Sequence, residues 1–199
     1  MAIFVKSHNL CFIHSPKTAG SSIQKWLLEN TDCEHWKLHC TLEQATQKFP
    51  SIKCSFAVVR NPWDWAVSSY CYEYKKIEYN LNLIKNKPGL INVKKDKYNI
   101  DVQNKKKKFL DRGFAHWLIN GHITPQSKFL NVDYVIKFES LHKDFEKIQD
   151  ILHIDNPLPH VNKTKRDNYK EYYTADTIKY VYNKYNDEIT KFGYKYETP

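Results

Sequence analysis

Apolar residues gather in three short, nearly continuous runs along the chain. They are LCFIHS at residues 10–15, CSFAVVR at residues 54–60 and DYVIKFE at residues 133–139. Uninterrupted runs of this length are typical of strands that are covered on both faces, as in parallel sheets. The pattern therefore predicts three buried strands.

Segments with helix-like patterning lie between and after these runs. The predicted helices are residues 21–29, 41–48, 62–75, 109–120, 140–152 and 174–192. Strands that alternate with helices favour a parallel sheet with right-handed crossovers. We therefore predict an α/β fold of three layers, with a central parallel sheet flanked by helices.

One stretch does not follow this pattern. Residues 77–108 are polar and rich in lysine, have no clear period and contain the only Pro-Gly pair, Pro88-Gly89. No Ser/Gly-rich linker and no repeat marks a second domain. The prediction is a single domain over residues 1–199 with a lysine-rich insertion at residues 77–108.

Composition and charge narrow the class of protein. The chain has 199 residues, of which 41% are hydrophobic, and a net charge of +9 with a pI of about 9.1. Such a charge favours an anionic partner: a nucleic acid, a charged polysaccharide or a phosphorylated cofactor. The first ten residues do not resemble a secretory signal, and no apolar run reaches the roughly 18 residues that span a bilayer. We expect a cytoplasmic protein without a membrane span.

Cysteine and histidine side chains are possible metal ligands. Five scattered cysteines without a CxxC pair are expected to be reduced thiols. Cys33, His35, His39 and Cys40 lie close together, but no second cluster with ligand spacing follows. We expect no metal site.

The first predicted strand runs into a turn, PKTAGSS at residues 16–22, and then into a helix. Such a turn directs free N–H groups toward an anion, which the helix dipole also favours. Lys17 adds a positive charge, and Gly20 allows unusual dihedrals or a close backbone approach. The Walker A pattern is absent because the lysine precedes the glycine. The alternative is a plain strand-to-helix turn with a surface lysine.

The second predicted strand ends in an arginine. P-loop NTPases typically carry an aspartate that helps hold magnesium at this place, whereas Arg60 suits a phosphate. Asn61 can cap the following helix, which puts Ser68 about two turns along it. Arg60 and Ser68 could therefore bind one further phosphate. The alternative is that Arg60 pairs with a carboxylate such as Asp64.

Together these stretches resemble the sulfotransferases that use 3′-phosphoadenosine 5′-phosphosulfate (PAPS), in particular the carbohydrate O-sulfotransferase branch and its bacterial and viral relatives. PKTAGSS is similar to the family's 5′-phosphosulfate loop and VRNPWDWAVSSY, at residues 59–70, to its 3′-phosphate motif. The resemblance extends through residues 124–145, 158–166 and 180–196. It implies a P-loop-like fold and sulfuryl transfer from PAPS to a hydroxyl acceptor, expected to be a saccharide, with release of adenosine 3′,5′-bisphosphate.

The resemblance also implies site residues. The expected cofactor contacts are Pro16, Lys17, Thr18, Ala19, Gly20, Ser21, Ser22, Arg60, Ser68, Lys165 and Arg166. Lys17 would stabilise the departing phosphate. The family usually has an arginine where this chain has Trp65, so the role of that arginine is missing here.

Proton removal from the acceptor requires a base, for which a histidine or carboxylate is suited. His39 lies between the two motifs, where family members commonly have a histidine, and is the expected general base. His14, His116 and His122 are alternatives. Glu73 is expected to be solvated, and His160 is expected to shape the loop that follows it.

Two other functions remain open. A nucleotide or small-molecule kinase with a degenerate phosphate loop would bind ATP and magnesium. A nucleic-acid-binding protein would use the lysine-rich insertion as an electrostatic arm, but the two ordered anion motifs would then be a coincidence. The sulfotransferase interpretation accounts for both motifs.

Overall fold

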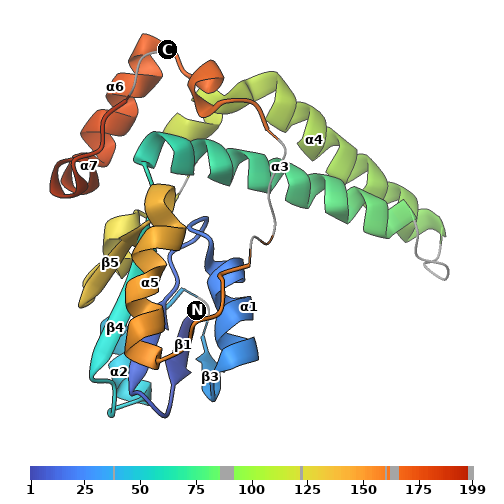
Figure 1. Ribbon diagram of the computed structural model, residues 1–199. Helices are drawn as coiled ribbons and strands as arrows, with labels where there is room; N and C mark the ends of the chain where they lie inside the picture. The colour runs from blue at the N-terminus through green and yellow to red at the C-terminus, as the bar shows by residue number, and fades with distance from the viewer. Residues whose placement is uncertain (38, 86–91, 122, 160, 162–165, 197–199) are drawn as a thin grey trace.

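The computed structural model describes residues 1–37, 39–85, 92–121, 123–159, 161 and 166–196. In this part of the chain a five-stranded sheet has the order β3-β1-β2-β4-β5 (Figure 1). The strands are β1 (Ala2–Val5), β2 (Leu10–Ile13), β3 (Cys33–Trp36), β4 (Cys54–Val59) and β5 (Tyr134–Lys137). The three strands predicted from the sequence are β2, β4 and β5.

The sheet is mixed rather than parallel. β2 pairs with β4 and β4 with β5 in parallel, as predicted, but β1 is antiparallel to both β2 and β3. For β1 and β2 the reason is the short turn at residues 6–9, where the Asn9 N–H donates to Lys6 O (3.3 Å) and Asn9 has a φ of 50°. Strands joined by so short a turn pair antiparallel. The predicted parallel pairing is therefore confirmed for β2, β4 and β5, whereas the sheet as a whole is mixed.

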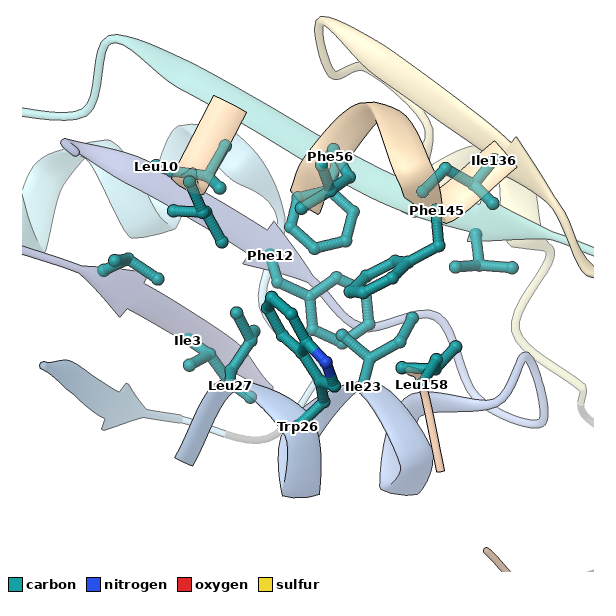
Figure 2. Packing of buried hydrophobic residues seen from close by; sticks show 14 residues of the cluster. Ile3, Leu10, Phe12, Ile23, Trp26, Leu27, Phe56, Ile136, Phe145 and Leu158 are labelled. Atoms are coloured by element: carbon teal, nitrogen blue, oxygen red, sulfur yellow. The ribbon is translucent and has the colours of Figure 1, made fainter. Parts of the chain in front are cut away.

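Helices cover both faces of the sheet. α1 (Gly20–Asn30) and α5 (Leu141–Leu152) pack on one face, where Trp26 and Phe145 meet edge to face at 5.0 Å (Figure 2). α2 (Leu42–Lys48) covers the other face, together with a short helix, η1 (Gln126–Phe129). This arrangement confirms the α/β class with a covered sheet.

α3 (Pro62–Lys85) and α4 (Asn92–Asn120) lie side by side and extend beyond the sheet (Figure 1). The prediction ended the first helix at residue 75 and began the second at residue 109. The described part of the lysine-rich stretch instead continues both helices, while residues 86–91, with the Pro-Gly pair, lie outside the described residues. α4 is kinked at Gly113, whose φ is 65°.

The remaining elements follow β5 along the chain. They are η2 (Phe138–Ser140), η3 (Tyr169–Tyr172), α6 (Ala175–Lys184) and α7 (Asn186–Phe192). α6 and α7 were predicted as one helix, but Tyr185 separates them because its φ of −120° is not helical. Among the described residues, no helix combines the length and apolar character needed to cross a membrane.

Candidate functional site

A cleft of about 1550 Å³ opens beyond the carboxyl ends of the three parallel strands. His14 follows β2, Arg60 follows β4 and Glu139 follows β5, and all three line it. α3 and the start of α1 complete its walls, and Figure 1 shows α3 running across this end of the sheet. Open α/β sheets bind ligands in this position, so the topology points to the cleft as the site.

The loop between β2 and α1 has an unusual backbone. Lys17 (φ 65°) and Ala19 (φ 61°) are left-handed, while Thr18 between them is not. Alternation of this kind turns successive N–H groups toward one side and forms an anion-binding concavity. Within the described residues, the N–H groups of residues 17–21 donate to no protein acceptor. They are free for a ligand.

Three successive carbonyl groups of the same loop are held by hydrogen bonds. The oxygens of residues 15, 16 and 17 accept, in that order, from Thr18 Oγ1 (2.7 Å), Trp65 Nε1 (2.9 Å) and Arg60 Nη1 (3.1 Å). Each hydrogen bond fixes a carbonyl against the protein. With these three carbonyls held, the loop offers its free N–H groups to the cleft, which suits an anion.

Gly20 is required by a neighbour rather than by its own dihedrals. A Cβ at this position would lie 1.9 Å from His14 Nε2, and its φ is not in the left-handed region. Of the two expected reasons for a glycine here, unusual dihedrals and a close backbone approach, the close approach is the one that applies. Lys17 and Ala19 adopt the left-handed conformation instead.

Arg60 forms an ion pair with Asp64, as the alternative interpretation of the sequence predicted. It donates to Asp64 Oδ2 from Nε (2.7 Å) and Nη2 (2.6 Å), and its guanidinium carbon lies 3.9 Å from the ring centroid of Phe138. Burial, offset in part by Asp64, lowers its pKa, but an arginine stays charged. With Nη1 bonded to the loop, two of its five N–H groups remain available.

Asp64 also pairs with Arg166, so one carboxylate holds two guanidinium groups together. Arg166 Nη1 is buried and has no hydrogen-bond partner among the described residues. A buried donor without a partner is rare and costly. Arg60 and Arg166 therefore form a positive cluster whose charge exceeds that of the single carboxylate, and an anion would satisfy the free donors.

Ser68 lies on the face of α3 that lines the cleft. Asp64, Ser68, Tyr72 and Lys76 all line it, at intervals of four residues. This spacing puts side chains on one helix face. Ser68 is 8% exposed, and its hydroxyl makes no hydrogen bond to another described residue. It is therefore free to donate beside Arg60, at the spacing that the sequence predicted.

Lys17 lies at the junction of the loop and α3. Its ammonium group is 4.0 Å from the ring centroid of Tyr72. Burial, and then the nearby charges of Arg60 and Lys75, lower its pKa from 10.5 to about 8. A cation that is partly desolvated in this way gains more from an anion than an exposed lysine would.

Two contacts connect the C-terminal part of the chain to the walls of the cleft. The Val161 N–H donates to Ser22 Oγ (3.0 Å), and Arg166 pairs with Asp64. Lys165, expected to contact the cofactor, and His160 lie outside the described residues. The residues next to them are held in place: Val161 by the start of α1, and Arg166 by α3.

The structure brings two of the candidate bases into the cleft. His39 is exposed there, and its ring centroid lies 6.2 Å from that of His14. Burial lowers the pKa of His14 to about 3, and partial burial also lowers the pKa of His39. Both are therefore neutral at pH 7, and the exposed His39 is the one that can reach a ligand and accept a proton.

Other candidates are less well placed. His116 on α4 contacts Asn120 (3.3 Å) and does not line the cleft, and His122 lies outside the described residues. Glu73 does line the cleft and accepts a hydrogen bond from Trp117 Nε1 (2.7 Å). Glu73 is exposed, as expected, but its carboxylate also accepts this hydrogen bond.

Some features of the cleft were not predicted from the sequence. His142 and Tyr72 line it, and Trp65 supports its loop. The four-residue spacing along α3 could have indicated Tyr72, whereas the others depend on tertiary contacts.

In the described part of the chain, no three His, Cys, Asp or Glu side chains come together in a way that could hold a metal ion. Comparisons with protein-family models, with curated proteins and with solved structures give no match.

Proposed function

We propose that this protein is a PAPS-dependent O-sulfotransferase with a P-loop-like fold. One observation carries the proposal: the loop after β2 has free N–H groups at residues 17–21 beside a cleft that is also lined by Lys17, Arg60 and Arg166. These donors form two groups, one at the loop and one at the start of α3. PAPS carries a phosphosulfate at its 5′ position and a phosphate at its 3′ position, and so needs two such groups.

In this proposal the loop binds the 5′ phosphosulfate. The N–H groups of residues 17–21 hold its oxygens, and Lys17 lies where negative charge develops as the sulfuryl group leaves. The 3′ phosphate binds to the free N–H groups of Arg60, to Ser68 Oγ and to Arg166 Nη1. Asp64 keeps the two arginines side by side although they repel each other.

PAPS supplies the sulfuryl group that is transferred. The acceptor hydroxyl attacks the sulfur while the bond between sulfur and the bridging phosphate oxygen breaks. His39 is the proposed general base and takes the hydroxyl proton, because it is neutral at pH 7 and exposed to the cleft. The proposed acceptor is a saccharide, for which the cleft has additional volume.

The kinase alternative fits the same cleft less well. A kinase of the P-loop type holds magnesium with carboxylate and hydroxyl oxygens near the phosphates. The carboxylate closest to the arginine cluster, Asp64, is already shared by Arg60 and Arg166. The distribution of charge thus favours a nucleotide that binds without magnesium.

Calorimetric titration tests the proposal. Adenosine 3′,5′-bisphosphate, ADP and ATP with magnesium are titrated into the wild type and into Lys17→Ala, Arg60→Ala and Ser68→Ala. Ser68→Ala removes one hydroxyl without leaving a charge unpaired, so its fold is expected to be intact. Lys53→Ala and Arg112→Ala remove the same charges at exposed positions away from the cleft and serve as matched controls.

We expect the bisphosphate to bind without magnesium and more tightly than ADP. Each cleft variant should weaken it by about tenfold or more, as for loss of a hydrogen bond to a charged group, while the controls leave it unchanged. Preference for ATP with magnesium would favour a kinase. Steeply salt-dependent binding of DNA or RNA that persists in Lys17→Ala and Arg60→Ala would favour a nucleic-acid-binding protein.

A further inference from the structure

We propose that Trp65 is a positioning residue, which holds the phosphate-binding loop in its anion-binding shape through the indole N–H. The indole Nε1 donates to Pro16 O at 2.9 Å, and the side chain is 0% exposed. Pro16 directly precedes Lys17, whose left-handed backbone starts the run of free N–H groups. The inference concerns this chain's own tryptophan and is separate from which anion binds.

The hydrogen bond fixes the carbonyl of Pro16, which could otherwise rotate toward the ligand. A carbonyl oxygen that faces the concavity would repel an anion. Thr18 Oγ1 and Arg60 Nη1 hold the carbonyls on either side of Pro16. Of these three donors, Thr18 belongs to the loop itself and Arg60 belongs to the proposed anion site. Trp65 is therefore the donor that supports the loop from outside without facing the ligand.

Trp65 is itself braced by the C-terminal helices. Its ring meets the ring of Tyr185 edge to face, with centroids 5.3 Å apart at 86°. Tyr185 is 1% exposed and lies between α6 and α7. A rigid, buried neighbour fixes the direction of the indole N–H, and a fixed donor holds its acceptor with little loss of side-chain entropy.

The chain provides a matched control on the same helix. Trp63 is 2% exposed, and its indole Nε1 donates to a backbone carbonyl as well, that of Ile178 at 3.2 Å. Ile178 lies on α6 and not in the loop. Trp63→Phe and Trp65→Phe thus remove the same group from equally buried positions, but only the second frees Pro16 O.

The effect on ligand binding rests on the proposed function and is measured with two nucleotides. Wild type, Trp65→Phe and Trp63→Phe are titrated with adenosine 3′,5′-bisphosphate and with adenosine 3′-monophosphate, which lacks the 5′ phosphate. We expect Trp65→Phe to weaken the bisphosphate by about 2- to 10-fold, the loss of one hydrogen bond, with the 3′-monophosphate unchanged. Trp63→Phe should change neither.

Hydrogen exchange tests the loop itself without a ligand. The amides of Ser22 and Ile23 donate to Ala19 O and report whether the loop keeps its shape. We expect them to exchange about 2- to 10-fold faster in Trp65→Phe than in Trp63→Phe, after correction for the global stability of each variant. Equal exchange in the two variants would overturn the inference.

The two measurements separate the possible failures. If the wild type binds neither nucleotide, the proposed function fails, and the exchange comparison still decides the role of Trp65. If the wild type binds the bisphosphate but Trp65→Phe binds it equally well, or loses both nucleotides to the same extent, Trp65 does not position the 5′ loop. An equal loss of the bisphosphate in Trp63→Phe would likewise contradict the inference.

Discussion

At the residue scale, the loop between β2 and α1 has several unusual features, and a different residue accounts for each of them. Gly20 provides space for the ring of His14, whereas the left-handed conformations belong to Lys17 and Ala19. Such conformations cost about 1 kcal/mol each for a residue with a side chain. The surrounding hydrogen bonds offset this cost, and the loop is set before any ligand arrives.

Gly20→Ala should lower the free energy of unfolding by about 1–3 kcal/mol, because the new Cβ overlaps the His14 ring. In a His14→Ala background the same change should be neutral or stabilising, since alanine favours helices more than glycine does. Urea denaturation of the two single variants and the double variant measures this coupling. Equal losses in both backgrounds would show that the ring is not the obstacle.

The pKa of Lys17 predicts how anion binding depends on pH. Because burial lowers that pKa to about 8, the ammonium group is charged below pH 8 and loses its proton as the pH rises above it. The pKa of Lys17 is lower in the folded protein than in the unfolded chain, so burial of the charged ammonium group lowers the free energy of unfolding below pH 8. This loss of stability decreases as the pH rises from 8 to 10.5.

Affinity for adenosine 3′,5′-bisphosphate should therefore fall above pH 8, by up to about tenfold per pH unit. Lys17→Arg should bind with an affinity that stays constant to pH 10, because arginine keeps its proton. Titrations at intervals of half a pH unit give both curves. A parallel decline in the two proteins would exclude Lys17 as the cause.

At the element scale, the end of β4 is fixed by a side chain rather than by another strand. Gln126 on η1 accepts from the Arg60 N–H and donates to Arg60 O, both at 2.9 Å, and is 1% exposed. The amide group thus continues the hydrogen bonding of the strand for one residue. This contact determines where Arg60 leaves the sheet and enters the cleft.

Gln126→Ala should lower the free energy of unfolding by about 2–4 kcal/mol, because two backbone groups of Arg60 lose their partners in the interior. It should also weaken bisphosphate binding, since Arg60 is no longer held. Gln149→Ala, which removes a single exposed hydrogen bond to Asn156 O, should cost less than about 1 kcal/mol. Thermal and urea denaturation compare them, and similar losses would contradict this role.

The elements that the sequence predicted correctly are those with a strong local signal. β2, β4 and β5 are continuous apolar runs, and α2 begins after Thr41, whose hydroxyl accepts from the Gln44 N–H. β3 has two polar residues, Glu34 and His35, between Cys33 and Trp36 and so lacks an apolar run. β1 is a buried apolar run of four residues, but it was not predicted. α3 was predicted too short because its second half lacks an apolar period of its own.

At the scale of the whole molecule, α3 and α4 extend away from the sheet, and the cleft lies at their base (Figure 1). On α3 the described cleft residues end at Lys76, while Glu78 pairs with Lys106 of α4 (2.8 Å). The outer part of the helix pair therefore lies beyond the cofactor site that we propose.

Replacing residues 81–103 with a short glycine and asparagine turn should leave bisphosphate affinity within about twofold, because distant sites act independently. Unfolding should remain cooperative, since Tyr70 still stacks on Phe109 at 4.8 Å. Calorimetry and circular dichroism check both. A tenfold or larger loss of bisphosphate affinity would show that the outer part of the helix pair takes part in cofactor binding. If the change instead abolished binding of a nucleic acid, the outer part of the helix pair would be the site for that partner.

The sequence by itself determined the local features of this protein: the buried parallel strands, the loop with its lysine and glycine, and the arginine and serine two turns apart. These follow from backbone geometry and from residues near one another in the chain. Tertiary structure alone decided that Trp65 supports the loop and that Asp64 joins Arg60 to Arg166. Such contacts join residues up to 102 positions apart, and no local pattern of apolar and polar residues encodes which of them meet.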